Sequence, residues 1–244
     1  MCHWPAVVVA TPAHSGVGDL LTYRSEHPLA PGTLVRVPLG AREVLGIVWR
    51  CDDTAPDGLA PGQARDIVGV LGDLPPLDAH WRGLVAFAAR YYQRALGEVA
   101  LAALPPPLRD VSPAQLARRL KRPARARHAP VPADAPRSLS DEQAAVLQRI
   151  DRADAPVLLF GATGSGKTEV YLQACADALA SDPAAQVLVL VPEINLTPQL
   201  ETRFRARFAA SHGEDAVVSL PSGMTPPQRL ASWIAAHTGR ARIV

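Results

Sequence analysis

The chain has 244 residues, of which 48% are hydrophobic, and a formal net charge of +2. This length suits one large domain or two small ones, and no run approaches the roughly 18 to 20 apolar residues that a membrane-spanning helix needs. The three cysteines lie far apart without a CxxC pair, which argues against a disulfide framework and a cysteine zinc cluster. We expect a cytoplasmic protein without a secretory signal, because no basic region precedes an apolar one at its start.

The first hundred residues have the pattern of a small β structure. Short apolar runs rich in β-branched residues at 6–10, 33–38, 44–50 and 67–71 are predicted to be strands. Gly and Pro turn signals separate these runs. Short strands at this spacing predict a small β-barrel or sheet.

A helical pattern follows from Asp78 to Ala95. Six apolar residues fall on one side of the predicted helix: Trp81, Leu84, Val85, Ala88, Tyr91 and Tyr92. Three consecutive prolines from Pro105 forbid a helix from continuing beyond Leu104. We therefore place a first domain at residues 1–108.

Residues 109–137 form a basic, proline-rich segment. It contains eight Arg and Lys residues against two Asp, with five prolines and one short predicted helix at 114–120. This composition is typical of a solvated linker. A linker that also holds a nucleic-acid phosphate backbone is the alternative.

From residue 138 to residue 244, helix and strand patterns alternate. Ser140 is a predicted helix N-cap, and wholly apolar runs such as 187–191 suit strands that are covered on both faces. Repeated β-α-β units predict a mostly parallel, doubly wound sheet. Because the sequence stops inside a predicted strand, we expect an amino-terminal fragment whose second domain is incomplete. The predicted helices are 141–150, 167–180, 198–210 and 226–236, and the predicted strands are 157–160, 187–191, 216–220 and 242–244.

One segment of this second domain matches the phosphate-loop motif G-x4-G-K-[ST], directly after a predicted strand and before a predicted helix. Backbone N–H groups of such a loop converge on a phosphate at the positive end of the helix. Lys167 would reach the β- and γ-phosphates of ATP, and the Thr168 hydroxyl would bind Mg²⁺. The predicted nucleotide-binding residues are Gly161, Ala162, Thr163, Gly164, Ser165, Gly166, Lys167 and Thr168.

ATP hydrolysis also needs a carboxylate at the end of another buried strand, to hold Mg²⁺ and orient water. Glu193 is the candidate in this sequence, but Pro192 separates it from the strand at 187–191. We expect the catalytic carboxylate to lie outside residues 1–244.

Several stretches together resemble the PriA family of replication-restart DNA helicases. They are residues 161–171, 191–199, 35–40, 45–48, 90–92 and 103–105. The resemblance covers about residues 5–107 and 138–244. It implies a 3′-DNA-binding domain followed by a RecA-like helicase lobe, and ATP-dependent 3′-to-5′ unwinding of DNA at stalled replication forks. The family usually inserts a winged-helix domain where this chain has its basic segment.

In this family the first domain is expected to bind the 3′-hydroxyl end of a nascent strand. The resemblance places the DNA contacts at Leu21, Thr22, Gly40 and Arg65. A glycine lets the terminal ribose approach the backbone, although Gly40 could equally be a plain turn residue, and an arginine can contact a phosphate. Leu21-Thr22 replaces the family's common Phe-Asp, so Thr22 or Asp19 would have to bind the terminal hydroxyl.

The resemblance also assigns three residues of the second domain. Gln143 would read adenine, because a side-chain amide both donates and accepts hydrogen bonds. An exposed helix residue is the alternative reading of Gln143. Thr197 and Gln199 would contact the DNA backbone, or Thr197 would simply cap a helix.

The implied cofactors are ATP and Mg²⁺, with zinc expected only outside residues 1–244. The implied partners are forked or branched DNA with a 3′ end, primosome proteins and single-stranded DNA-binding protein, at the nucleoid in the cytoplasm. Two other functions remain open. One is a DNA-binding, nucleotide-sensing module that does not hydrolyse ATP. The other is a phosphate-loop kinase or transporter ATPase, which would lack a fork-binding domain.

Overall fold

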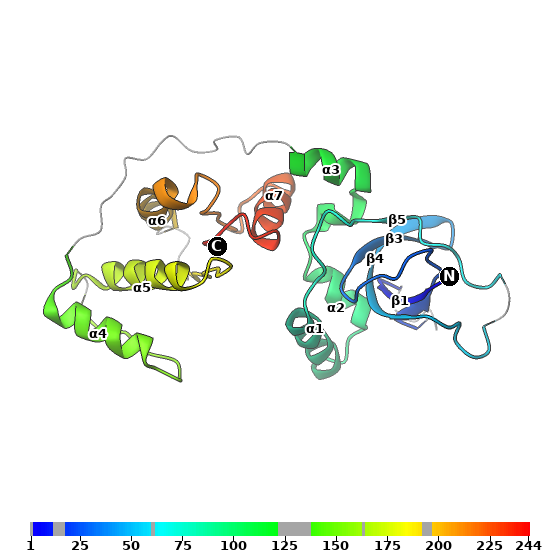
Figure 1. Cartoon of the computed structure of the whole chain (residues 1–244), viewed down its shortest axis with the longest axis horizontal. Helices are drawn as coiled ribbons and strands as arrows, with labels where there is room; N and C mark the ends of the chain where they lie inside the picture. Colours follow the sequence, from blue (N-terminus) through cyan, green and yellow to red (C-terminus); the bar gives the residue numbers. More distant parts are fainter. Residues whose placement is uncertain (1, 12–17, 60–61, 122–137, 163, 192–196) are drawn as a thin grey trace. The chain divides into compact units, whose positions relative to one another are not determined.

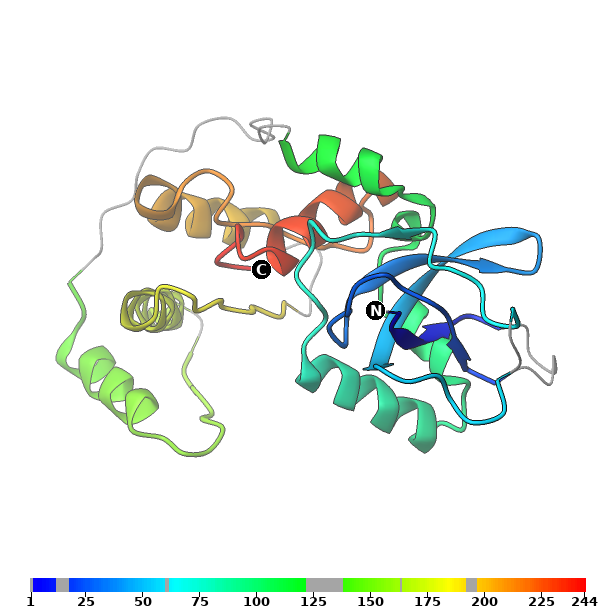
Figure 2. The ribbon, with the colours of Figure 1, turned by 45° about the vertical axis from the view of Figure 1, so that its right-hand side comes forward.

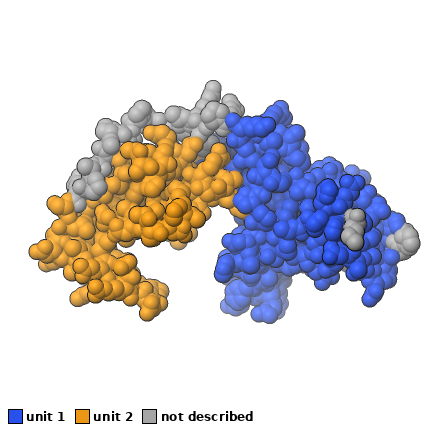
Figure 3. Space-filling model, in the orientation of Figure 1, with its two compact units in different colours: residues 1–123, 225–234 blue, residues 124–224, 235–244 orange. Residues whose placement is uncertain are grey.

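The computed structural model describes residues 2–11, 18–59, 62–121, 138–162, 164–191 and 197–244 (Figure 1). The chain divides into two compact units, residues 1–123 with 225–234 and residues 124–224 with 235–244 (Figure 3). Most of the predicted linker, residues 122–137, lies outside the described residues. Within the described ranges, no helix has both the length and the hydrophobicity needed to cross a membrane.

Unit 1 is built on a five-stranded antiparallel sheet in the order β2-β1-β4-β3-β5 (Figure 2). The four strands predicted from the sequence are present, and the short strand β2 is an addition that the sequence pattern did not indicate. The strands are β1 (Trp4–Val9), β2 (Leu20–Thr22), β3 (Leu34–Leu39), β4 (Arg42–Asp52) and β5 (Gly69–Val70).

Both faces of this sheet are buried. Side chains alternate between the faces of a strand, so Val8 joins one apolar cluster while Val7 and Val9 join the other. The cluster around Val8 includes residues of the helices that follow the sheet, such as Leu101 and Leu108. This double burial explains why the central strands are apolar at nearly every position.

The predicted barrel is wrong, because the sheet is open. β2 and β5 form its two edges and do not pair with each other. They have three and two residues, which is too short for a ladder that would close the sheet. The segments next to these edges are joined by an isolated parallel bridge between Arg24 and Asp66 and by the ion pair of their side chains.

The helices of unit 1 follow the sheet in the chain. They are α1 (Ala79–Tyr91), α2 (Leu96–Ala102), the 3-10 helix η1 (Pro106–Asp110) and α3 (Pro113–Lys121). Helix α2 approaches β1 so closely that a Cβ on Gly97 would lie 1.8 Å from the Val9 carbonyl oxygen. Only glycine fits at this crossing.

The predicted helix from Asp78 to Ala95 ends early, and its buried side differs from the predicted one. Asp78 caps α1 by accepting a hydrogen bond from the Trp81 N–H, and α2 starts separately after Ala95. Val85 is buried, but Leu84 is 65% exposed. The aromatic rings of α1 instead gather at the surface, where Phe87 stacks on Tyr91 and Tyr91 meets the edge of Tyr92.

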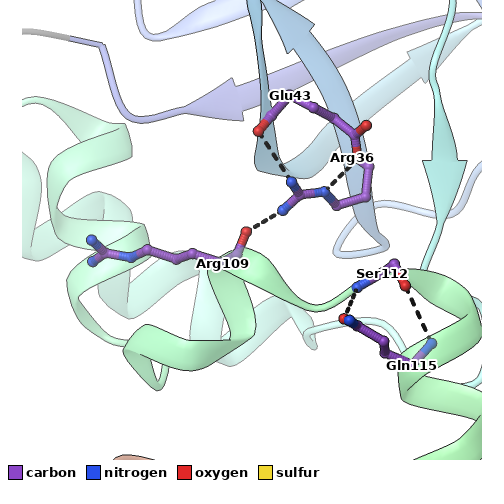
Figure 4. Close-up of polar contacts among 5 residues, drawn as sticks. All are labelled: Arg36, Glu43, Arg109, Ser112 and Gln115. Carbon is purple, nitrogen blue, oxygen red and sulfur yellow. Dashed lines mark hydrogen bonds and ion pairs between the residues drawn. The ribbon is translucent and has the colours of Figure 1, made fainter.

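A buried arginine ties the end of η1 to the sheet (Figure 4). Arg36 Nε on β3 donates to Glu43 Oε1 on β4 at 2.8 Å, and another guanidinium nitrogen of Arg36 donates to the Arg109 carbonyl. Ser112 and Gln115 then exchange side chain–backbone hydrogen bonds of 3.0 and 3.2 Å, which form a capping box at the start of α3. The Arg36 contacts thus hold η1 on the sheet, and the capping box begins α3 directly after it.

The remaining helices agree with the four helices predicted for the second domain. They are α4 (Asp141–Asp151), α5 (Lys167–Ser181), α6 (Thr197–His212) and α7 (Pro226–His237). Ser140 caps α4, as its position predicted. The first part of α7, including Leu230, is counted with unit 1, which is therefore discontinuous in the sequence.

In place of the named strands of the predicted parallel sheet, the described residues of unit 2 have extended segments in the order 187–189, 242–244, 216–218. Isolated parallel bridges join Val187 to Ile243 and Val217 to Ile243. The predicted strand at 157–160 does not form, because these residues have no ladder partner in the described part of the chain. As a consequence Leu158 and Phe160 are 87% and 91% exposed.

Candidate nucleotide and DNA sites

The predicted phosphate loop enters α5 through two glycines with left-handed backbone conformations. Gly164 and Gly166 have φ angles of +85° and +80°, and Gly166 is the N-cap of α5. A Cβ on Gly166 would lie 2.2 Å from Gln143 Nε2. The left-handed conformation therefore favours glycine at this position, and a larger residue would also displace the Gln143 side chain from the loop. Thr163 lies outside the described residues.

Lys167 is the first residue of α5, and its ammonium group lies against the loop. Its Nζ donates hydrogen bonds to the carbonyl oxygens of Gly161 at 2.5 Å and Ala162 at 2.8 Å. The ammonium is therefore near the N-terminal end of α5, where a helix favours an anion. These carbonyl contacts must exchange for phosphate oxygens when a nucleotide binds.

Thr168 has a partner that the sequence analysis missed. The Tyr171 hydroxyl donates to Thr168 Oγ1 at 3.1 Å, one helical turn further along α5. The i, i+3 spacing of the two hydroxyls was the available signal. A threonine hydroxyl can be one of the oxygen ligands of Mg²⁺. This ion usually has one or two protein ligands and completes its coordination with waters and substrate phosphates. The described residues thus fit a nucleotide-bound Mg²⁺ held by Thr168.

Gln143, which the resemblance assigns to adenine, lies beside Gly166 of the phosphate loop. Its Nε2 donates to the Gly166 carbonyl at 3.5 Å, and its Oε1 accepts from the Ser140 N–H at 2.9 Å. Both ends of the amide therefore have partners within the protein, and one contact or both must open before the amide can read a base.

The remaining predicted residues of unit 2 are only partly described. Glu193 lies outside the described residues. Thr197 is the first residue of α6, and Gln199 is exposed in the first turn of that helix. An exposed side chain at a helix start is accessible to a DNA phosphate.

In unit 1, Gly40 and Arg65 are in direct contact. Gly40 opens the two-residue turn between β3 and β4 with a φ of +62°, as is typical of tight hairpins. Arg65 Nη1 donates to the Gly40 carbonyl at 2.6 Å. Apart from Gly40 itself and its two chain neighbours, no heavy atom of the described residues lies within 4 Å of the position of a Cβ on Gly40. The turn therefore presents an open backbone surface next to a guanidinium group.

Tyr23 connects this turn to Leu21-Thr22. The Tyr23 hydroxyl donates to the Pro38 carbonyl at 3.0 Å, close to the end of β3. Burial raises the pKa of the Tyr23 phenol, and the charge of Arg65 partly offsets this effect. Tyr23, another residue that the sequence analysis missed, therefore links the predicted DNA contacts.

The two residues before Tyr23 differ in their surroundings. Leu21 packs against the apolar cluster around Val7, whereas Thr22 is half-buried on the opposite face of β2. Asp19 accepts a hydrogen bond from the Leu96 N–H at 2.7 Å at the start of α2. Thr22 is thus better placed than Asp19 to meet a terminal hydroxyl.

Cys175 on α5 provides a chemical probe of the helix that carries the phosphate loop. Burial raises the pKa of its thiol to about 11, so the reactive thiolate is on the order of one in ten thousand at neutral pH. We expect Cys175 to resist alkylation in the folded chain while the exposed Cys2 reacts. Mass spectrometry of a labelling time course with and without denaturant measures this difference. Equal labelling rates in the folded chain would show that α5 is not packed as described.

Comparisons with known proteins match the two regions separately. A family model of the 3′ DNA-binding domain matches residues 6–105, and a model of DEAD/DEAH box helicases matches residues 140–244. The replication restart protein PriA of Synechocystis is 50% identical over 88 residues, which is 36% of this chain and 10% of the relative. The proteins of the same name from Rickettsia conorii and Treponema pallidum are each 31% identical, over 72% and 83% of this chain. These matches cover 25% and 29% of those relatives, so the chain spans less than a third of their length.

Proposed function

Since the chain belongs to the PriA family of replication restart proteins, we propose that it forms part of an ATP-dependent 3′-to-5′ DNA helicase that recognises stalled or branched replication forks. In such a protein, unit 1 binds the 3′ end of a nascent strand and unit 2 binds ATP·Mg²⁺. Primosome assembly then follows fork recognition. The proposed protein partners are primosome proteins and single-stranded DNA-binding protein.

The observation that carries this proposal is the occurrence of two distinct sites in one chain. The Gly40–Arg65 contact offers an open backbone turn beside a cation, which suits a terminal ribose and its phosphate. The phosphate loop offers Lys167 and the positive end of α5 to an anion. A kinase or transporter ATPase has no need of the first site.

We assign the roles within these sites as follows. Gly40, Arg65 and Thr22 contact the 3′ end, while Leu21 supports them from the apolar cluster. Lys167 and the loop from residue 161 hold the phosphates, Thr168 binds Mg²⁺, and Gln143 reads adenine. Thr197 and Gln199 contact the DNA backbone. We propose a first domain at residues 1–108, to which the folded helices η1 and α3 also belong, a linker in the remainder of residues 109–137, and a RecA-like lobe at 138–244.

ATP hydrolysis by residues 1–244 alone is the measurement that separates a helicase part from a complete enzyme. Neither the extended segment at 187–189 nor the one at 216–218 is followed directly by a carboxylate that could orient water. We expect the chain to bind ATP but to show no hydrolysis above background, with or without forked DNA, in a phosphate-release assay. If the protein is instead a nucleotide-sensing module, a longer form should also show no ATP hydrolysis. If it is a helicase, a longer form that supplies the missing carboxylate should hydrolyse ATP. Turnover by residues 1–244 that Glu193→Gln abolishes would contradict the placement of the carboxylate outside them.

A further inference from the structure

A buried ion pair joins the helix that carries the phosphate loop to the next helix. Arg207 Nη2 on α6 lies 2.5 Å from Glu169 Oε1 on α5, and the two side chains are only 4% and 8% exposed. Glu169 is the third residue of α5 and follows Thr168 directly. The pair thus holds the first turn of α5, in which the predicted nucleotide contacts lie.

A gain in folding stability does not explain why an ion pair, rather than two apolar side chains, is buried here. A buried ion pair offsets the loss of hydration only when its remaining polar atoms are also satisfied. Three atoms of this pair, Glu169 Oε2 and Arg207 Nε and Nη1, are buried without a hydrogen-bond partner in the described part of the chain. Two well-packed apolar side chains would therefore be at least as stabilising here.

The position of Glu169 in the first turn of α5 and its negative charge explain the ion pair better. The Glu169 N–H donates to the Gly166 carbonyl at 2.9 Å, so a shift of Glu169 moves the N-cap of α5 as well. Glu169 also places a negative charge in the first turn of a helix that is expected to bind phosphate. Buried charges are screened only weakly by salt, so Arg207 is needed to keep this end of α5 attractive to an anion.

We propose that Arg207 is a positioning residue of the nucleotide site: through Glu169 it fixes the first turn of α5 and neutralises the carboxylate next to Lys167 and Thr168. This inference rests on the proposed ATP-binding function. It adds a residue from α6 that contacts neither the phosphate loop nor Mg²⁺.

The test compares Glu169→Met, Arg207→Met and the double variant in the whole chain. We expect both single variants to lower the melting temperature, because each leaves one buried charge unpaired. The double variant should regain most of this loss in melting temperature. Affinity for a fluorescent ADP analogue with Mg²⁺ should fall about tenfold or more in Arg207→Met, where Glu169 stays anionic. The nucleotide affinity of the double variant should stay several-fold below that of the wild type, although its melting temperature recovers. A purely structural pair would regain affinity and stability together, and that result would overturn the proposal.

A matched control lies two residues away on the same helix. Arg205 pairs with Glu201 within α6 at 3.0 Å and is similarly buried, but it makes no contact with Glu169. Arg205→Met should lower the melting temperature while it leaves the nucleotide affinity unchanged. An equal loss of affinity in Arg205→Met and Arg207→Met would also overturn the proposal.

Hydrogen exchange of the nucleotide-free chain keeps this inference separate from the proposed function. In the double Met variant, the amides of the first turn of α5 should exchange several-fold faster than in the wild type, whereas the end of α5 should not change. If the wild type binds no nucleotide but this local effect appears, the proposed function fails and the positioning role stands. If the wild type binds nucleotide and exchange in the double variant equals that of the wild type, the positioning role is refuted.

Discussion

Lys167→Ala is expected to weaken ATP binding by about a hundredfold or more. The ammonium group is the one cation of the described phosphate loop, and a hydrogen bond to a charged group contributes about 1.5–3 kcal/mol, so two such contacts amount to at least a hundredfold in affinity. The two carbonyl contacts of Lys167 in the nucleotide-free chain are lost as well. Their loss should change stability by less than about 1 kcal/mol, because the carbonyls can bind water instead. Isothermal titration calorimetry with ATP and Mg²⁺ measures the affinity.

The sequence offers a matched control for this experiment. Lys121, the only other lysine, is exposed at the end of α3 in unit 1. Lys121→Ala should bind ATP like the wild type. Equal ATP affinity of Lys167→Ala and the wild type would refute the assignment of residues 161–168 as a nucleotide site.

The second expected result is that the chain binds a fork with a free 3′-hydroxyl about fivefold to tenfold better than a fork ending in a 3′-phosphate. Gly40 presents a bare backbone turn that a ribose hydroxyl can approach, whereas a phosphate would bring two negative charges next to the carbonyl oxygens of this turn. Arg65 attracts a phosphate in general, but here one of its nitrogens is already bonded to the Gly40 carbonyl. We therefore expect repulsion between the phosphate and these carbonyl oxygens to outweigh its attraction to Arg65. Fluorescence anisotropy with both forks at one fixed salt concentration measures the preference.

Substitutions separate the preference for the 3′-hydroxyl end from the general attraction of Arg65 to DNA phosphates. A Cβ at Gly40 has open space among the described residues beyond its chain neighbours, but a non-glycine residue must adopt the left-handed φ of +62°, which costs about 1–2 kcal/mol. Gly40→Leu should therefore stay folded and lose the preference for the hydroxyl end. Arg65→Ala should weaken both forks alike and flatten the salt dependence, while Arg50→Ala, an exposed arginine on β4, should do neither. Equal affinity of the wild type for the two forks would mean that only general DNA binding remains.

The elements that the sequence predicted well are those with a strong local signal. The helices of unit 2 follow from their caps and apolar spacing, and Ser140 with Gln143 even forms the capping box that their separation by three residues allows. The turn at Gly40 and the entry into α5 at Gly166 were predictable because glycine marks unusual backbone conformations.

The features that the sequence did not predict depend on distant partners. Whether the sheet of unit 1 closes depends on the lengths of β2 and β5, which local patterns do not reveal. The buried side of α1 is set by the sheet beneath it, so Leu84 and Tyr91 turned out to be exposed although they fit a helical stripe. Arg207 lies 38 residues from Glu169 in the sequence, and no spacing rule connects them.

The uncovered apolar residues of unit 2 bear on how this chain behaves in a test tube. Leu158, Phe160, Leu188 and Leu190 are between 67% and 91% exposed, which is more than scattered surface leucines account for. Such a surface lowers colloidal stability, so self-association should increase with protein concentration. Salts such as sulfate strengthen the effect because they are excluded from protein surfaces. Dilute samples, mild detergents or polar replacements at Leu158 and Phe160 are therefore the practical route to a monodisperse preparation for the binding experiments above.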